Sequence, residues 1–198
     1  MMLSGPPVPA YEPRLLRPAT DSTGRAARAP TGPGRVATGE PLYGTLVGDI
    51  MVRDVVTVGP TATLRTAALL LSHKRISGLP VVEENGEVVG VLSEKDIVRI
   101  LQQRGGLSLP GGVFDLLLEP SGARQRDMLT RCHHILDDTQ VNSAMTSPAQ
   151  TILPSATTME AIRRMVSSHI NRLPVVENRR LVGIVTRRDV LSAHVEPS

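Results

Sequence analysis

A five-residue segment, LPVVE, occurs twice in this chain of 198 residues, at 79–83 and again at 173–177. A second motif follows it each time, GVLSEKD at 90–96 and GIVTRRD at 183–189. Such self-similarity constrains the fold strongly, because each copy must adopt the same supersecondary structure. Since there are only two copies, we expect two similar halves packed on each other rather than a solenoid.

Each copy shows the same order of local signals. An extended segment ends near Val58 or Ile152, and a helix follows it. A strand comes next, then a turn, which is Asn85-Gly86 in the first copy, and a second strand at 88–92 or 181–185. A last helix begins near Ser93. The helical spacing rests on two sets of residues, Leu64, Ala67, Ala68 and Leu71, and Thr158, Ala161, Ile162 and Met165.

These signals predict an α/β (α+β) fold made of two β-α-β-β-α units, each with helices on one face of a three-stranded sheet. Thr157 and Glu160 resemble a capping box at the start of the first helix of the second copy. One such unit is too small to be stable alone, so the two are expected to share a core.

The copies divide the chain into four parts. Residues 1–44 are rich in Pro, Gly and Arg without apolar periodicity, and we expect a disordered tail there. The first copy covers 45–104 and the second covers 141–195. The linker at 105–140 begins with glycines, and it contains a predicted helix with one apolar face that caps the module or supports a partner contact. That face carries Met128, Cys132, Ile135 and Leu136.

The repeated motif has two interpretations. Ser93 or Thr186 with an aspartate three residues later, Asp96 or Asp189, is typical of a helix N-terminus. The glycine then allows a tight approach between strands. The alternative is a ligand site, because a helix N-terminus suits phosphate and an aspartate can accept hydrogen bonds from a ribose diol. In that case the glycine lets the backbone approach the ligand. The recurrence behind LPVV favours the second interpretation.

The chain resembles a tandem pair of CBS domains, the cystathionine β-synthase type regulatory module. The resemblance is carried by ISGLPVVEENGEVVGVLSEKDIV and INRLPVVENRRLVGIVTRRDVL, with IMVRDVVTV and AMTSPAQTI before them, and it covers about residues 45–195. It implies that the two copies pack about a pseudo-two-fold axis. It also implies clefts for an adenosine-containing ligand (AMP, ADP, ATP or S-adenosylmethionine) and a homodimer.

The resemblance also assigns roles by position. Asp96 and Asp189 match the ribose-binding acid, and Ser93 and Thr186 match the hydroxyl near ribose or phosphate. Thr57 and Thr151 match a polar contact to the base. The stretches lining adenine run from Ile76 through Gly78 to Pro80, and from Ile170 to Pro174.

Arg172 matches a phosphate-reaching position, where the first copy has Gly78. Further phosphate candidates are Arg187, Arg188, His169 and Lys95, although solvated charges at helix starts explain each of them equally well. These arginines make the second motif the better expected phosphate site and GVLSEKD the weaker or empty one.

Composition narrows the remaining function classes. The chain has two Tyr, one Phe and no Trp, which argues against base-stacking platforms, and a net charge of +3 does not predict nucleic-acid binding. Cys132 is the single cysteine, and no apolar run approaches the roughly 18 residues of a membrane span. We therefore expect a cytoplasmic protein. Cys132, His133, His134, Asp137 and Asp138 lack the spacing of a closed zinc site, so no metal is expected.

Three functions follow from these observations. The first is a non-catalytic sensor that binds an adenine nucleotide or S-adenosylmethionine between the copies and signals through an unidentified protein effector or a second copy. The second is a dimerisation and interaction scaffold with empty clefts. The third is an enzyme, which we disfavour because the sequence shows neither a nucleophile–base signature nor a Walker-type loop.

Overall fold

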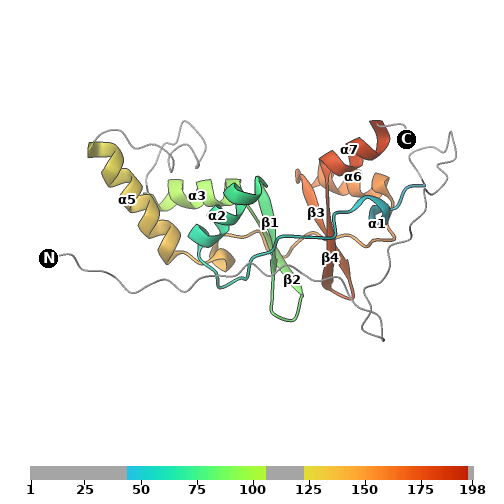
Figure 1. The fold of residues 1–198 in the computed structure, drawn as a ribbon, viewed down its shortest axis with the longest axis horizontal. Coiled ribbons are helices and arrows are strands. Elements are labelled where there is room, and N and C mark those ends of the chain that lie inside the picture. Colours follow the sequence, from blue (N-terminus) through green and yellow to red (C-terminus); the bar gives the residue numbers. More distant parts are fainter. Residues whose placement is uncertain (1–43, 106–122, 196–198) are drawn as a thin grey trace.

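A computed structural model describes residues 44–105 and 123–195, and the predicted tail lies outside these ranges except for Gly44. The mixed α/β fold with two similar halves is confirmed (Figure 1). Among the described helices, none combines the length and apolar character needed to cross a bilayer. The elements are α1 (Val47–Ile50), α2 (Leu64–Lys74), β1 (Gly78–Val82), β2 (Val88–Ser93), α3 (Glu94–Gly105), α5 (Ala123–Asp138), η1 (Val141–Ser143), α6 (Thr158–Ser167), β3 (Arg172–Glu177), β4 (Arg180–Thr186) and α7 (Arg187–Val195).

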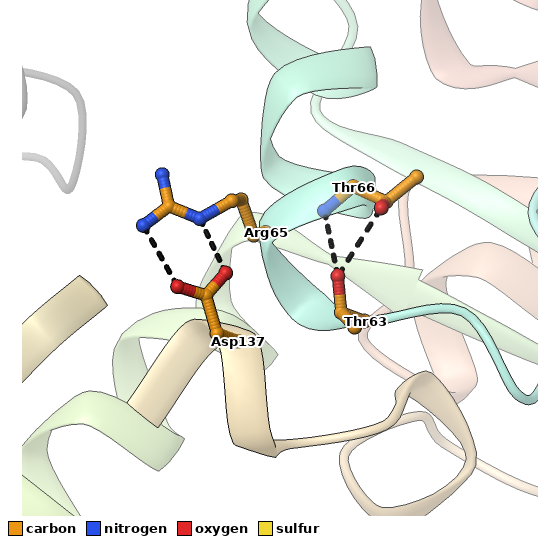
Figure 2. Close-up of polar contacts among 4 residues, drawn as sticks. All are labelled: Thr63, Arg65, Thr66 and Asp137. Atoms are coloured by element: carbon orange, nitrogen blue, oxygen red, sulfur yellow. Dashed lines mark hydrogen bonds and ion pairs between the residues drawn. The ribbon is translucent and has the colours of Figure 1, made fainter. Parts of the chain in front are cut away.

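A threonine N-cap precedes the first helix of each copy, Thr63 before α2 and Thr157 before α6. The Thr63 side chain accepts a hydrogen bond from the Thr66 N–H at 3.2 Å, as Figure 2 shows. Thr157 does the same for Glu160 at 3.2 Å. The predicted capping box is only half formed, because the Glu160 side chain pairs with Arg164 instead of the Thr157 backbone. The predicted apolar positions face the two cores, and Ile162 alone is only partly buried.

Each copy then forms one antiparallel hairpin, β1–β2 or β3–β4. In the first hairpin, Gly86 has a φ of 87° and the Asn85 side chain accepts from the Glu87 N–H at 2.9 Å. This confirms the turn predicted at Asn85-Gly86. In the second hairpin the turn residues Asn178 and Arg179 have positive φ values of 49° and 66°. The two hairpin tips also meet, since the Leu181 N–H donates to the Gly86 carbonyl at 3.1 Å.

The third strand of each predicted sheet is reduced to one bridged residue. Val58 lies parallel to Val81, and Ile152 lies parallel to Val175. The N–H of each bridging residue donates to a strand proline carbonyl, Pro80 at 3.2 Å or Pro174 at 3.0 Å. A proline follows two residues after each bridge, at Pro60 and Pro154. Because proline has no N–H to donate, the pairing does not extend.

The opening segments of the two copies are exchanged. Val47 and Met51 belong to the core of the second half, with Leu173 and Val185. The Val47 N–H donates to the Ala156 carbonyl at 2.8 Å, and Val52 bridges Ile184. We call residues 45–52 the first arm. Figure 1 shows α1 beside α6 and α7, although α1 belongs to the first copy in the sequence and α6 and α7 belong to the second.

The second arm, residues 139–146, crosses in the opposite direction. Val141 and Ala144 lie in the core of the first half, and the Leu64 N–H donates to the Thr139 carbonyl at 2.8 Å. Thr146 bridges Val91 as Val52 bridges Ile184. The two arms therefore make equivalent contacts, as a pseudo-two-fold relation between the halves requires.

The predicted linker helix exists as α5, and it covers the first half only. Cys132 and Leu136 are buried in the core formed by α2 and α3. Leu129 is also buried, Ile135 packs partly against the core, and Met128 is half-buried. At the edge of this contact Arg65 of α2 forms an ion pair with Asp137, shown in Figure 2.

Candidate functional site

The hydroxyl and the aspartate of each repeated motif form a helix cap. Asp96 Oδ2 accepts from the Ser93 N–H at 2.9 Å and from Ser93 Oγ at 2.6 Å. Asp189 Oδ2 accepts from the Thr186 N–H and Oγ1, both at 2.7 Å. The helix-start interpretation is therefore confirmed in both copies, and any ligand role of these carboxylates is additional to it.

The second oxygen distinguishes the two aspartates. Asp96 Oδ1 accepts from Arg99 Nη2 at 2.7 Å, and the same nitrogen donates to the Ala144 carbonyl at 3.0 Å. In the second motif the corresponding position is Ser192. Within the described residues, Asp189 Oδ1 has no hydrogen-bond or ion-pair partner. The Asp96 carboxylate is therefore paired with a cation, whereas the Asp189 carboxylate has no such partner among the described residues.

The motif glycines are explained by packing. A Cβ on Gly183 would lie 2.6 Å from Met51 Sδ and 3.1 Å from the Val52 carbonyl oxygen. A Cβ on Gly90 would lie 2.5 Å from Met145 Sδ. Each arm thus crosses its strand at the glycine. The tight-approach interpretation of these residues is the one that the geometry supports.

A cavity of about 360 Å³ lies between the first motif and the second copy. The first half contributes residues 93–96 together with Ser77 and Val91. The second copy contributes residues 168–172, from the end of α6 to the start of β3. Thr146, at the end of the second arm, and Pro148, Ala149 and Gln150, which follow it, complete the lining. Backbone carbonyls, hydroxyls, both signs of charge and apolar side chains are all available to a ligand there.

Arg172 links the two copies at the edge of this cavity. Its Nη1 donates to the Gly78 carbonyl at 2.7 Å and its Nη2 donates to Ser77 Oγ at 2.5 Å. Burial lowers the pKa of Arg172, and the nearby Glu94 carboxylate partly offsets this effect. A Cβ on Gly78 would lie 2.6 Å from Nη1, so this position has room for only one side chain from the two copies.

The cavity brings together four of the predicted ligand residues, Ser93, Asp96, Ile170 and Arg172, and the phosphate candidates Lys95 and His169. Gly78 contacts Arg172 from the adjoining strand. The remaining predicted residues lie elsewhere: Pro80 and Pro174 are buried in β1 and β3, Ile76 packs on the first core, Thr57 is buried, Thr151 is half-buried next to Gln150, and Thr186, Arg187, Arg188 and Asp189 form the start of α7.

Arg172 was predicted to act with the motif of its own copy, GIVTRRD, but it lies beside the motif of the other copy. The cavity at GVLSEKD therefore holds the arginine that was expected to favour GIVTRRD. Ser77 lines the cavity and lies within the predicted stretch 76–80, whereas Glu94 and Gln150 were not among the predicted ligand residues. The difference between Gly78 and Arg172 at equivalent positions was taken as a sign of two unequal sites, whereas in the structure these two residues contact each other.

The metal candidates Cys132, His134, Asp137 and Asp138 lie on different faces of α5. Cys132 is buried in the first core, and burial raises the pKa of its thiol. His134, Asp137 and Asp138 are exposed on other faces of α5. Within residues 44–105 and 123–195, no group of three His, Cys, Asp or Glu side chains is arranged to hold a metal ion.

Comparison with known proteins identifies relatives over most of the described chain. The CBS domain family matches residues 47–103 and 140–196. An uncharacterized protein of Methanocaldococcus jannaschii, MJ1426, is 32% identical over 154 residues, which are 75% of this chain and 90% of that protein.

Two solved structures of similar fold contain ligands. A structure of CBSX2 in complex with AMP is 26% identical, with a TM-score of 0.56 over 76% of this chain and 96% of that one. The CBS domain pair of protein MJ0100 in complex with 5'-methylthioadenosine and S-adenosyl-L-methionine is 25% identical, with a TM-score of 0.56 over 75% and 94%.

Proposed function

Because this chain belongs to the CBS domain family, we propose that it is a non-catalytic sensor of an adenosine-containing ligand, which binds between the two copies. The observation that carries the proposal is the cavity, since it joins the capped Ser93–Asp96 pair of one copy to residues 168–172 of the other. Relatives of the same fold hold AMP or S-adenosyl-L-methionine.

The cavity chemistry fits such a ligand. Asp96 lines the cavity at a helix start, and each of its carboxylate oxygens can accept a further hydrogen bond, from a ribose hydroxyl, beside those from Ser93 and Arg99. Ile170, Val91 and Pro148 give apolar surface for a flat base. Lys95 and Arg172 supply positive charge for a phosphate. A ligand held by both copies changes their packing only to the extent that it binds one arrangement better than another.

We propose that the response is read by a partner or by a second copy of the chain. Val166 of α6 and Leu191 of α7 are 59% and 63% exposed, whereas α5 covers the equivalent helices of the first half. This leaves α6 and α7 as the candidate contact surface. Light scattering of the purified protein with and without ligand measures the assembly state.

A thermal-shift panel of AMP, ADP, ATP, S-adenosylmethionine and adenosine tests the sensor proposal. A ligand at a hundredfold excess over its Kd stabilises the fold by about 2.7 kcal/mol, which raises the Tm by roughly 5–10 °C in a chain of this size. No shift with any of the five ligands would contradict the proposal and favour the empty scaffold.

Asp96→Asn and Asp189→Asn form a matched pair for locating the ligand. Both variants keep an acceptor for the helix cap and lose a carboxylate. Asp96→Asn also weakens the pair with the half-exposed Arg99, which contributes less than about 1 kcal/mol, so both effects on stability are small. We expect Asp96→Asn to lose the ligand-induced shift and Asp189→Asn to retain it. A shift lost only in Asp189→Asn would place the ligand at the other motif.

A further inference from the structure

Arg172 occupies the meeting point of the two copies and is already bonded there. Its guanidinium donates to Ser77 Oγ and to the Gly78 carbonyl, and both acceptors belong to the first copy. Neither acceptor carries a formal charge. The same side chain lines the cavity beside Ser93 and Asp96. Arg172 therefore has two roles, because it bonds the second copy to the first and also forms part of the cavity wall.

The surroundings of Arg172 leave its charge incompletely satisfied. It is half-buried, and burial lowers its pKa despite the attraction of Glu94. The other carboxylate of the cavity, Asp96, is already paired with Arg99. A phosphate adds an opposite charge and can accept two parallel N–H···O bonds from a guanidinium, which a carbonyl and a hydroxyl on separate residues cannot match. A phosphate in the cavity is thus a better acceptor than the two that Arg172 now has.

We propose that Arg172 is a latch between the copies, and that a phosphate group on the ligand opens it by drawing the guanidinium from Ser77 and Gly78. The charge of the ligand, rather than its nucleoside part, is then what changes the contact between the copies. This inference rests on the proposed function, and it narrows the ligand to a phosphorylated adenosine.

The latch makes opposite predictions for two substitutions. Ser77→Ala removes a neutral acceptor that competes with the phosphate, so the affinity for AMP rises roughly two- to tenfold. Arg172→Gln removes the cation, so the affinity for AMP falls by about tenfold or more towards that of adenosine. The affinity for adenosine stays unchanged in both variants, because adenosine carries no phosphate. Isothermal titration with both ligands measures these constants, and Ser192→Ala on exposed α7 is the control substitution.

Two results overturn the latch. One is an AMP affinity that falls or stays constant in Ser77→Ala, because the bond to Ser77 then does not compete with the ligand. The other is an equal loss of AMP and adenosine affinity in Arg172→Gln, which is what a purely structural arginine produces.

Inorganic pyrophosphate separates failure of the latch from failure of the nucleotide proposal, because it requires no recognition of a nucleoside. In ¹⁵N-labelled protein, the Arg172 Nε–H resonance should shift on pyrophosphate titration, and at lower concentration in Ser77→Ala. If this shift occurs while no adenosine ligand binds, the latch stands and the proposed function fails. If adenosine ligands bind while pyrophosphate leaves the resonance unmoved, the latch is wrong and the proposed function stands.

Discussion

Gly183 and Gly90 show how one missing side chain sets the contact between a strand and an arm. Each glycine lies under a methionine of the arm that crosses it, Met51 or Met145. The clash that a Cβ would create involves a flexible thioether and also a backbone carbonyl, which cannot move away without displacing the arm. A methyl group added at either glycine should therefore lower the free energy of unfolding.

We expect Gly183→Ala to lower the free energy of unfolding by about 1–3 kcal/mol, because it overpacks the contact with Met51. Gly59→Ala is the matched control, since a Cβ there meets nothing within 4 Å. Urea denaturation measures both. In a Met51→Ala background the added cost of Gly183→Ala should shrink, because the two residues share one contact. Equal costs in the two backgrounds would contradict this explanation.

At the residue scale, the sequence predicted hydrogen bonds between residues close in the chain, but it did not predict contacts between residues of different copies. The Ser93–Asp96 and Thr186–Asp189 caps followed from their three-residue spacing. The position of Arg172 beside the first motif did not, because its partners Ser77 and Gly78 lie in the other copy. A repeat alignment shows which positions are equivalent, but it does not show which of them touch.

Among the elements, α5 makes the two halves unequal. It covers α2 and α3 through its buried face, with Leu136 and Cys132 in the first core. The ion pair between Arg65 and Asp137 lies at the rim, where both side chains are partly exposed to water. Exposed pairs of this kind contribute little, so docking of α5 depends on its apolar face.

Leu136→Ala should cost about 2–5 kcal/mol of unfolding free energy, because it leaves a cavity in a fully buried site. Asp137→Ala should cost less than about 1 kcal/mol, and it is the natural control one residue away. Urea denaturation gives both values. A larger cost for Asp137→Ala than for Leu136→Ala would show that the ion pair holds the helix.

Cys132 gives a second readout of the same docking. Burial hides its thiol and raises the thiol pKa, so less of the reactive thiolate is present at pH 8 than in an exposed cysteine. We expect slow labelling by a thiol reagent in the native protein and clearly faster labelling in Leu136→Ala. Equal rates in the two proteins would show that the packing of Leu136 does not limit the exposure of Cys132.

The helix α5 and the hairpins were predictable from period and turn residues, and the third strands were not. The apolar spacing of Met128, Cys132, Ile135 and Leu136 indicated the helix and its face. The extended segments ending at Val58 and Ile152 read as strands because their valines and threonines suit a sheet. Pro60 and Pro154 limit each of these segments to a single bridge. Both prolines are visible in the sequence, but the prediction of a third strand did not take them into account.

For the whole molecule, the exchanged arms mean that sequence halves and structural halves differ. The family matches and our expected boundaries both assign residues 47–52 to the first copy, yet Val47 and Met51 complete the second core. Similarity between the copies predicted two packed halves correctly. That similarity did not predict the exchange of the arms, because the apolar residues of either arm are suited to either core.

Val47→Ala and Val141→Ala test the exchange as a matched pair. Both side chains are fully buried, one in each arm, and each loss should cost about 2 kcal/mol. Hydrogen exchange should then speed up mainly in β3 and β4 for Val47→Ala, and mainly in β1 and β2 for Val141→Ala. The reverse pattern would mean that each arm supports its own copy.

The exchange also bears on how such a chain could arise by gene duplication. A gene for one copy alone would encode an arm that its own product leaves unused, while the core of that product lacks one. Two molecules of that product could satisfy each other by trading arms, as domain-swapped dimers do. Joining two such genes end to end then alters the connectivity of the chain while every contact between the halves stays as it was.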